Sequence, residues 1–480
     1  MSGTGIISYG YHLPWYRMNR KSIAAALGAL GKGSYTQGEK VVANYDEDSV
    51  SMAVNACFDC LKNDNANNVK GLLFASTTAP YRERESAGII GTALNLNPNI
   101  RTADFGDSLK AGTSALLFAL DAVKAGHGNF LVCGSDCRQG MPGSNEEMLF
   151  GDGAAALLIG NNNAIATLEG SYSVSYDFPD YRRLSGDKYV RSTEDRFSRE
   201  EGYQKILPEA IKGLMQKCNL EAKDVTKIAY PCTNIREHSS VGSKLGFQPS
   251  QIQQPLLALT GEMGTASPLM SLVIALEEAN PGDKIIIASY GNGAEALCFK
   301  VTDEILKVTN RGRFQKSLAN NRKLNSYEKF LVFKGLLQTA VFDELVAGTQ
   351  ISLVWRNRKM IYALHGTRCK KCGTPQYPSQ RVCVNPDCQA IDQMEDYSFA
   401  DKPAKLFSYT LDHASACPNP PLIYGFIDFE GGGRFVFDIT DCEPDMLKTG
   451  MPMKMSFRRK YLDELRGIVG YYWKAVPERE

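Results

Sequence analysis

Residues 104–126, DFGDSLKAGTSALLFALDAVKAG, are the stretch around which the fold is organised. Small residues in its first third predict a tight turn, and the residues after it repeat apolar side chains at helical spacing. The first turn of such a helix offers free backbone N–H groups and the positive end of the helix dipole, which stabilise a cysteine thiolate. Leu109 stands at this position, so the stretch resembles a nucleophile site but has no nucleophile. The buried face of the helix is expected to carry Ala111, Ala115, Phe118, Ala119 and Ala122.

The composition is that of a multidomain globular protein. The chain has 480 residues, 43% of them hydrophobic, which is enough for two or three domains with separate cores. The net charge of +1, with both signs interspersed, argues against a nucleic-acid partner and against an anionic membrane surface. Because the sequence shows no signal-peptide pattern and no apolar run of about 18 residues, we expect a cytoplasmic protein.

Strand and helix patterns alternate through the first 305 residues and predict an α/β fold. The alternation occurs twice, which predicts two similar halves at about residues 1–165 and 166–305. The predicted helices are residues 49–63, 86–94, 202–218 and 263–279, together with the helix that the turn at residues 107–112 opens within residues 104–126. The predicted strands are residues 70–76, 101–105, 129–134, 154–159, 227–230 and 284–289.

This region resembles the hydroxymethylglutaryl-CoA synthase branch of the thiolase superfamily, particularly its archaeal form. The resemblance covers about residues 3–305 and implies the duplicated, five-layered thiolase fold. It also implies dimerisation through a central strand, for which the apolar residues 129–134 are the candidate. The matching segments are GIISYGYHLPWYR (5–17), YDEDSVSMAVNA (45–56), DSLKAGTSALLFAL (107–120), KLGFQPSQI (244–252) and PGDKIIIASYGNGAEA (281–296).

The catalytic residues implied by this resemblance are replaced. The family's glutamate aligns with Thr77, its acyl-accepting cysteine with Leu109 and its histidine with Pro231, and a nearby asparagine aligns with Glu262. Claisen chemistry needs a thiolate to hold the acyl group and a base to move the α-proton. Threonine, leucine and proline can do neither at pH 7, so we expect no hydroxymethylglutaryl-CoA synthesis by the isolated chain. Replacing Leu109 by alanine is expected to cost about 2–5 kcal/mol of stability if the side chain is buried.

Other residues are weaker candidates for chemistry. Cys232 lies near His238 in PCTNIREHSS, and these two residues with Glu262 form the alternative of a relocated active site. A packed thiol and a loop histidine are the interpretation that we favour for the pair. Cys57 and Cys60 form a CxxC on a predicted helix, where core packing is favoured. The segments GDGAAA and GNGAEA lack phosphate-loop spacing and are interpreted as turns at strand ends.

Residues 306–345 are predicted to connect the thiolase-like domain to the C-terminal region. Their first part is polar and basic, and a helix is predicted from Tyr327 onward. An apolar stripe on this helix is expected to dock back onto the folded chain. The stripe consists of Phe330, Leu331, Phe333 and Leu336.

Residues 346–395 carry the strongest local motif of the sequence. Cys369 and Cys372 form a CxxC, and Cys383 and Cys388 come after it with four residues between them. Two such cysteine pairs, about ten residues apart, can surround one ion tetrahedrally without an open position. The spacing therefore predicts a zinc ribbon with one structural Zn2+.

Residues 396–480 are predicted to form a small antiparallel barrel. Five short strands are expected at residues 404–409, 421–428, 434–439, 452–458 and 470–476, with a glycine hairpin at residues 431–433. The segments GTRCKKCG, KLFSYTLDH, GFIDFEGGGRFVFDI and MLKTGMPMKMSF resemble the DUF35 family, a zinc ribbon joined to an OB-fold. The sequence lacks the basic aromatic groove of oligonucleotide-binding OB-folds. The resemblance instead implies a companion of thiolase-like proteins that contacts acyl-CoA.

Together, these features predict a catalytically degenerate, acyl-CoA-binding subunit of a hetero-oligomer. A partner thiolase would supply the active cysteine for making or cleaving a C–C bond next to a coenzyme A thioester, for example in thiolytic cleavage of a 3-oxoacyl-CoA. The resemblance extends to complexes with this division of labour in anaerobic aromatic degradation and phloroglucinol biosynthesis. The alternatives are a self-sufficient acyltransferase or retro-aldol enzyme that uses Cys232, His238 or Glu262, and a scaffold without a ligand.

Overall fold

The computed structural model describes residues 3–27, 37–61, 65–232, 234–309, 311–339 and 350–479. Contacts divide the chain into two compact units. The first contains Met1–Ala43, Asn55–Gly88 and Asn97–Phe330, and the second contains Asn44–Val54, Ile89–Leu96 and Leu331–Glu480. The domain boundaries expected near residues 305, 345 and 395 stay predictions. Residues 340–345 of the expected connector and 346–349 of the expected ribbon lie outside the described residues.

Nine strands of the first unit form one mixed sheet. They are β1 (Gly5–His12), β4 (Val69–Ala75), β5 (Arg101–Phe105), β6 (Asn129–Asp136), β7 (Gly153–Gly160), β8 (Ala166–Ser175), β11 (Lys227–Ala229), β12 (Lys284–Tyr290) and β13 (Gly293–Val301). Their order is β11-β12-β13-β8-β1-β7-β6-β4-β5.

The strand pairings are symmetric about the contact between β1 and β8. On one side β1, β7 and β6 pair antiparallel, and β4 runs parallel to both β6 and β5. On the other side β8, β13 and β12 pair antiparallel, and β11 runs parallel to β12. Ile228 of β11 also forms a parallel bridge to Ile252, at the position that β5 has in the first half. The predicted duplication is therefore present in the strand topology.

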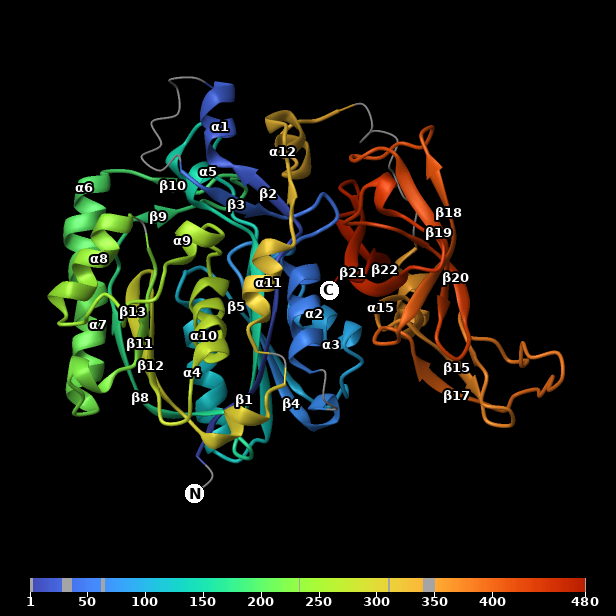
Figure 1. Cartoon of the computed structure of the whole chain (residues 1–480), viewed down its shortest axis with the longest axis horizontal. Helices are drawn as coiled ribbons and strands as arrows, with labels where there is room; N and C mark the ends of the chain where they lie inside the picture. The colour runs from blue at the N-terminus through green and yellow to red at the C-terminus, as the bar shows by residue number, and fades with distance from the viewer. Residues whose placement is uncertain are drawn as a thin grey trace. The chain divides into compact units, whose positions relative to one another are not determined.

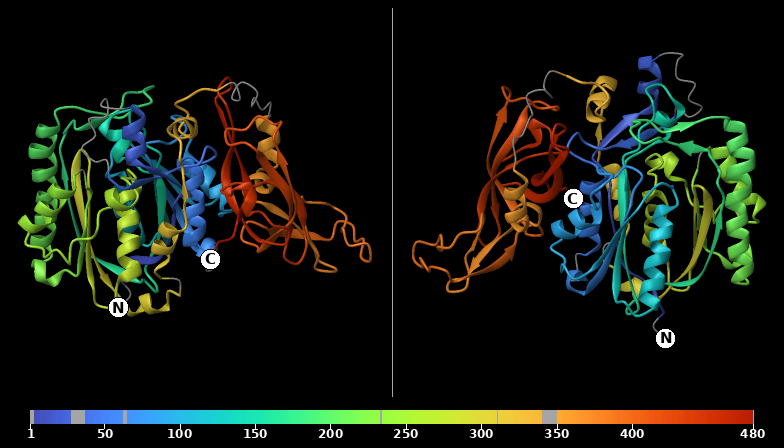
Figure 2. Two further views of the ribbon diagram at one scale, coloured as in Figure 1. Left: turned by 45° about the horizontal axis from the view of Figure 1, so that its top comes forward. Right: turned by 180° about the vertical axis from the view of Figure 1, so that it is seen from behind.

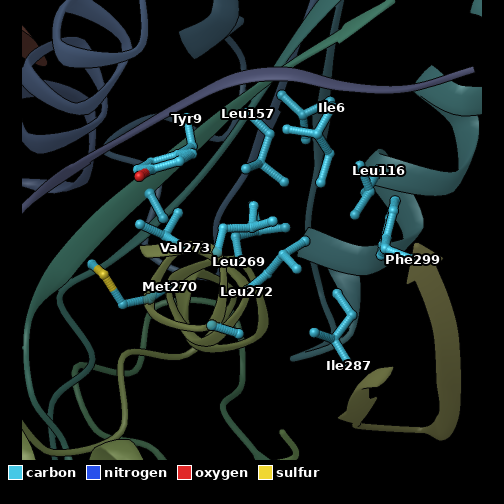
Figure 3. Close-up of a cluster of buried hydrophobic side chains, with 14 of the residues drawn as sticks. Ile6, Tyr9, Leu116, Leu157, Leu269, Met270, Leu272, Val273, Ile287 and Phe299 are labelled. Carbon is cyan, nitrogen blue, oxygen red and sulfur yellow. The ribbon is translucent and has the colours of Figure 1, made fainter. Parts of the chain in front are cut away.

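Two helices, α4 (Ala111–Lys124) and α10 (Ala266–Glu278), lie between the two halves of the sheet (Figure 1). Both belong to one hydrophobic core, and nearly every residue of α10 is buried. Figure 3 shows Leu269 of α10 among side chains from both halves of the sheet, including Leu157 and Ile287. A helix without a polar face, such as α10, must be covered on all sides, which explains its place in the middle layer.

Further helices cover the outer faces of the sheet. Helices α7 (Gln204–Lys217) and α8 (Ile235–Lys244) cover the second half (Figure 2). The second half of α2 (Ser49–Cys60) covers the first, where Gly10 of β1 lies so close to Ala56 and Cys60 that a side chain would clash. Cys57 and Cys60 are buried there, as the core-packing interpretation predicted. The layers of the predicted thiolase fold are thus confirmed.

Two details of the first half differ from prediction. Phe118 was expected on the buried face of α4, but 63% of it is exposed and its ring packs against Phe105 of the edge strand. The buried stripe instead combines Ala111, Ala115 and Ala119 with the leucines beside them. Residues 129–134 were expected to be a dimerisation strand, but they belong to β6, which has β7 and β4 as neighbours on its two sides. Within the described part of the chain, the strand with a neighbour on one side only at this end of the sheet is β5.

Smaller elements accompany the large sheet, and two of them contribute residues to both units. The connector helix α12 (Tyr327–Phe333) begins where it was predicted, and Phe330 and Phe333 are buried as expected. Of the described helices, none has the length and apolar character needed to cross a membrane. The other elements include β2 (Tyr16–Asn19), α1 (Arg20–Leu27), β3 (Glu39–Val42), α3 (Ser86–Ala93), α5 (Asn145–Leu149), β9 (Tyr181–Arg182), β10 (Arg191–Ser192), α9 (Leu256–Leu259) and α11 (Arg313–Ala319).

The second unit contains a ribbon and a barrel. The ribbon is a three-stranded sheet of β15 (His365–Cys369), β16 (Pro375–Gln376) and β17 (Met394–Ser398). The barrel strands are β18 (Ala404–Asp412), β19 (Leu422–Phe429), β20 (Arg434–Asp438), β21 (Pro452–Asp463) and β22 (Ile468–Pro477), in the order β20-β19-β18-β21-β22. A parallel bridge from Ile439 to Ala475 joins the two ends of this sheet. The five predicted strands, the glycine hairpin and the small OB-fold barrel are therefore present.

Candidate functional site

Thr77 follows the end of β4 and is held by a buried carboxylate. Its backbone N–H and its hydroxyl donate to Oδ1 of Asp136, at 2.8 and 3.1 Å. Ser76 and Thr78 donate their hydroxyls to the same oxygen at 3.1 and 2.8 Å. Thr77 was predicted to align with the family glutamate. Its backbone N–H and its hydroxyl are both engaged by Asp136.

Leu109 precedes Lys110, the N-cap residue of α4, and its side chain is partly exposed. The helix start therefore has the position expected for a nucleophile. A second feature neutralises this helix end: Glu295 of β13 accepts hydrogen bonds from Thr113 and Ser114 at 2.5 and 2.9 Å. Lys110 Nζ lies 3.6 Å from the same carboxylate. A buried anion beside the first turn opposes the thiolate stabilisation that the helix dipole would give.

Pro231 follows β11, and its carbonyl oxygen accepts a hydrogen bond from the Tyr203 hydroxyl at 2.7 Å. The next residue, Cys232, donates its backbone N–H to Oε1 of Glu262 at 3.3 Å, and Ser267 donates to Oε2 at 3.1 Å. Burial raises the pKa of Glu262 to about 7, although these donors and Arg138 favour its charged form. Of the predicted candidates, Glu262 alone combines partial exposure with a pKa suited to proton transfer near pH 7.

The structure does not bring Cys232 and His238 together as a pair. His238 was expected on the surface or in a loop, but it lies in α8 and is buried. Burial raises the pKa of the Cys232 thiol, and this side chain belongs to an apolar cluster with Leu149 and Phe150. His238 stacks on Tyr230 at 4.2 Å between ring centroids, bonds to the Tyr230 backbone and leaves Nε2 without a partner among the described residues. Burial lowers the pKa of His238 to about 4, so its ring is neutral at pH 7. A buried thiol without a neighbouring base stays protonated and is not an activated nucleophile.

Close packing connects the four family positions. Thr265, just before α10, donates its N–H and hydroxyl to Oδ2 of Asp136 at 2.8 and 3.0 Å. A Cβ on Gly112 in the first turn of α4 would lie 2.2 Å from the Thr265 carbonyl oxygen, and one on Gly291 would lie 3.0 Å from Leu109 Cβ. The ends of β4, β6 and β12 and the starts of α4 and α10 therefore meet at one place. The four family positions that surround this place, Thr77, Leu109, Pro231 and Glu262, are all partly exposed.

In this arrangement, Glu262 has a carboxyl group that can exchange a proton near pH 7. The arrangement cannot form an acyl-enzyme at Leu109, because a leucine side chain has no nucleophilic atom. The chemistry available within the first unit is therefore acid–base chemistry near the Glu262 carboxyl group.

The four predicted metal ligands come together in the second unit. The Sγ atoms of Cys369, Cys372, Cys383 and Cys388 all lie within 4.8 Å of one another. The Cys369–Cys388 and Cys372–Cys383 sulfur pairs are 3.8 and 3.5 Å apart. A tetrahedral site with metal–sulfur bonds of about 2.3 Å separates its sulfurs by about 3.8 Å. These residues therefore fit one tetrahedral metal ion.

Three residues of the candidate site were not predicted. Asp136 follows the apolar run of β6, Arg138 comes two residues later, and Glu295 interrupts the buried strand β13. Each is a charged residue in or directly after a strand that is otherwise apolar, and this is the only sequence signal that could have identified them. The hydrogen bonds that give Asp136 and Glu295 their roles join segments far apart in the sequence.

Comparisons with known proteins agree with the fold and the two-part architecture. Residues 215–301 match the family "3-Oxoacyl-[acyl-carrier-protein (ACP)] synthase III C terminal", and residues 398–458 match "ChsH2, C-terminal OB-fold domain". The chain is 30% identical to the hydroxymethylglutaryl-CoA synthase of Methanopyrus kandleri, over 70% of this chain and 98% of that protein. It is 32% identical to that of Methanosphaera stadtmanae, over 70% of this chain and 99% of that protein.

Two solved structures show the same fold. An HMG-CoA synthase complexed with CoA matches with a TM-score of 0.62 and 19% identity, over 72% of this chain and 95% of that chain. The 3-oxoacyl-[acyl-carrier-protein] synthase III of Aquifex aeolicus matches with a TM-score of 0.54 and 18% identity, over 62% of this chain and 100% of that chain. The first unit therefore has the fold of an acyl-CoA condensing enzyme.

Proposed function

Because the chain belongs to the hydroxymethylglutaryl-CoA synthase family, we propose that it is a cytoplasmic, acyl-CoA-binding subunit without an acyl-accepting nucleophile. The single observation that supports this proposal is Leu109 at the start of α4, beside the buried carboxylate of Glu295. In this proposal Leu109 stands where the family has its nucleophile, and neither a leucine side chain nor the neighbouring Glu295 carboxylate suits a thiolate. Binding and positioning remain as the functions of this place.

The active cysteine is then supplied by a partner thiolase in a hetero-oligomer. In that complex a C–C bond next to a coenzyme A thioester is made or cleaved, for example by thiolysis of a 3-oxoacyl-CoA. The similarity of residues 398–458 to the ChsH2 OB-fold supports a composite architecture, because the barrel is an addition to the condensing fold. Within the first unit, we assign the partner to the open edge of β5, where Arg101 and Asp104 are exposed.

The proposal is tested by coexpressing this chain with candidate thiolases, above all one encoded by an adjacent gene. The copurified complex is incubated with substrate thioester and quenched, and both chains are analysed by mass spectrometry. We expect the acyl adduct on a cysteine of the partner only. An adduct on this chain, or turnover by this chain alone that requires Cys232, would overturn the assignment.

The four-cysteine cluster is proposed to hold one structural Zn2+. Cys369, Cys372, Cys383 and Cys388 provide four sulfur ligands and leave no open coordination position. The ion would therefore shape the ribbon and take no part in the reaction. Elemental analysis of freshly purified, unchelated protein should give about one zinc per chain, and a result of none would contradict this.

A second candidate function is aldol cleavage of a 3-hydroxyacyl-CoA, because Glu262 is a partly exposed residue whose carboxyl group has a pKa of about 7. Glu262 would take the proton of the 3-hydroxyl group as the C2–C3 bond breaks. That bond's electron pair would form the thioester enolate, whose C2 is then protonated. The products are an aldehyde or ketone and a shorter acyl-CoA, and no nucleophile is needed.

The two functions are distinguished with the isolated chain. Carbonyl product from a 3-hydroxyacyl-CoA, lost in Glu262→Gln, would favour aldol cleavage. No product from the isolated chain, together with thiolysis by the complex, would favour the subunit role. Ser267→Ala is the matched control, because it removes one donor to Glu262 but leaves the carboxyl group in place.

A further inference from the structure

Arg138 is a buried cation that packs against two aromatic rings. It follows β6 by two residues, and only 5% of it is exposed. Its guanidinium carbon lies 3.9 Å from the ring centroid of Phe150 and 5.2 Å from that of Tyr181. These contacts fix the plane of the guanidinium group in an apolar cluster that also contains Cys232.

Among the residues that the structure describes, this guanidinium group makes no hydrogen bond and no ion pair. Asp136, Glu262 and Asp180 are near enough to influence it electrostatically, but each has donors of its own. Asp136 accepts from Thr77 and Thr265, Glu262 from Cys232 and Ser267, and Asp180 from the Tyr181 backbone at 2.7 Å. The N–H groups of Arg138 are therefore left without a protein acceptor.

A buried guanidinium group whose N–H groups have no protein acceptor is unfavourable unless another group supplies an acceptor. Burial lowers the pKa of Arg138, which reflects the loss of hydration of the charged form. The planar fork of N–H donors matches both oxygens of a carboxylate, and such bidentate pairs are strong where water is excluded. The environment thus has the chemistry of a site for one carboxylate.

Arg138 also lies beside the family positions of the candidate site. A Cβ on Gly264 would lie 2.2 Å from Oδ2 of Asp136 and 2.9 Å from Cδ of Arg138. Asp136 is the residue that anchors Thr77, and Gly264 is two residues from Glu262. An anion held by Arg138 would therefore be part of the molecule that occupies this site.

We propose that Arg138 binds a carboxylate at the far end of the acyl group, so that the site selects coenzyme A thioesters of dicarboxylic acids. This rests on the proposed acyl-CoA binding, and it deepens that proposal by naming the substrate class. Phe150 and Tyr181 hold the guanidinium group in position.

The test compares thioesters that differ only in the terminal group. Binding of succinyl-, glutaryl- and adipyl-CoA to the full-length chain is measured by calorimetry against butyryl-, valeryl- and hexanoyl-CoA, respectively. We expect at least tenfold tighter binding of the dicarboxylic member in one pair or more. A wild-type chain without preference in any pair would overturn the proposal, whereas monocarboxylic binding would still support acyl-CoA binding. No binding of any thioester would overturn both.

Variants show whether Arg138 causes the preference. In Arg138→Met the affinity ratio of the preferred pair should fall to about one, and Arg138→Lys should keep part of it, because lysine keeps the charge but not the fork. Arg182→Met, an exposed residue beside Tyr181, is the matched control and should leave both affinities unchanged. An unchanged ratio in a folded Arg138→Met variant would refute the assignment, and so would loss of the ratio in Arg182→Met.

Discussion

Arg458 in the second unit and Arg138 in the first are both buried arginines, and their surroundings differ sharply. Arg458, in β21, is 1% exposed by side chain and lies 3.3, 2.8 and 2.5 Å from carboxylate oxygens of Asp46, Glu47 and Asp441. Arg138 is stacked on aromatic rings and has no such partner in the described chain. The first arginine is neutralised by its own protein, and the second is left for a ligand.

The comparison separates two uses of buried charge. Around Arg458, the chain supplies acceptors from the 44–54 segment and from the barrel, and Lys474 pairs with Asp46 at 3.0 Å in the same cluster. Removing Arg458 takes away a buried counter-charge that Asp46, Glu47 and Asp441 share. Around Arg138, changing the side chain leaves no ion-pair or hydrogen-bond partner behind among the described residues. The stability of the two units should therefore respond differently to substitution, while ligand binding should depend on Arg138.

The largest effect is expected at the four-cysteine cluster, which like Arg458 belongs to the second unit and is self-contained. Cys372→Ser should remove the metal and unfold the ribbon, because the metal-binding free energy, about 10 kcal/mol in small zinc domains, contributes to folding. Metal analysis and limited proteolysis of residues 365–398 measure this. Cys218→Ser in the first unit is the control and should keep the metal. A Cys372→Ser protein with full metal content and an intact ribbon would contradict the assignment.

The next effect tests Arg458 directly. Arg458→Met should destabilise the second unit by about 3–5 kcal/mol, because three carboxylates lose their counter-charge in a buried place. Denaturant unfolding followed by tryptophan fluorescence reports it, since Trp473 lies in the neighbouring strand β22. Arg466→Met, whose partner Asp463 is 3.5 Å away and whose side chain is 46% exposed, should change stability by less than about 1 kcal/mol. Equal losses of stability in Arg458→Met and Arg466→Met would contradict the stabilising role assigned to the buried ion pairs of Arg458.

In the first unit, the free energy of unfolding is expected to depend on pH through Glu262. Burial raises the folded-state pKa of Glu262 from 4.5 to about 7, so its stabilising contribution is complete below pH 4.5 and is lost as the pH rises through 7. The loss should be on the order of 1–3 kcal/mol, since one pKa unit corresponds to about 1.4 kcal/mol. The difference in unfolding free energy between wild type and Glu262→Gln, measured from pH 4 to 8, isolates this contribution. A difference independent of pH would show that Glu262 keeps an ordinary pKa.

At Leu109 the effect on stability should be smaller. Leu109 is partly exposed, so Leu109→Ala should cost about 1–2 kcal/mol, less than the 2–5 kcal/mol expected for a buried leucine. Leu116→Ala, at a fully buried position of α4, is the control and should fall in the higher range. Thermal unfolding of both variants measures the difference. A larger loss in Leu109→Ala than in Leu116→Ala would mean that Leu109 is a core residue.

The smallest effect on stability is expected for Arg138→Met. The variant loses two cation–π contacts but also removes a buried charge without a partner, so stability should change by about 1 kcal/mol or less. Arg182→Met again provides the exposed control. Destabilisation as large as that of Arg458→Met would show that Arg138 is a structural residue like Arg458.

The sequence by itself determined the features whose cause is local. The spacing of alanines and leucines in residues 111–124 is enough to predict α4, because helical periodicity lies within one segment. The four cysteines predict their own cluster for the same reason, since paired spacing limits how far the sulfurs can separate. The identity of Leu109, and hence the absence of a nucleophile there, is also a fact of the sequence alone.

Only the tertiary structure decided which groups meet. Phe118 has helical spacing with buried residues but faces outward beside β5, and residues 129–134 form an apolar strand that pairs on both sides. Asp136 accepts a hydrogen bond from Thr265, which lies 129 positions later in the chain. Because this carboxylate already has donors, it is not an acceptor for Arg138. The periodicity of a segment indicates which of its residues are apolar. Strand order, and which acceptor each hydrogen-bond donor contacts, depend instead on contacts between distant segments. The physical reason is that a buried charge is defined by its neighbours, and those neighbours are assembled only when the chain folds.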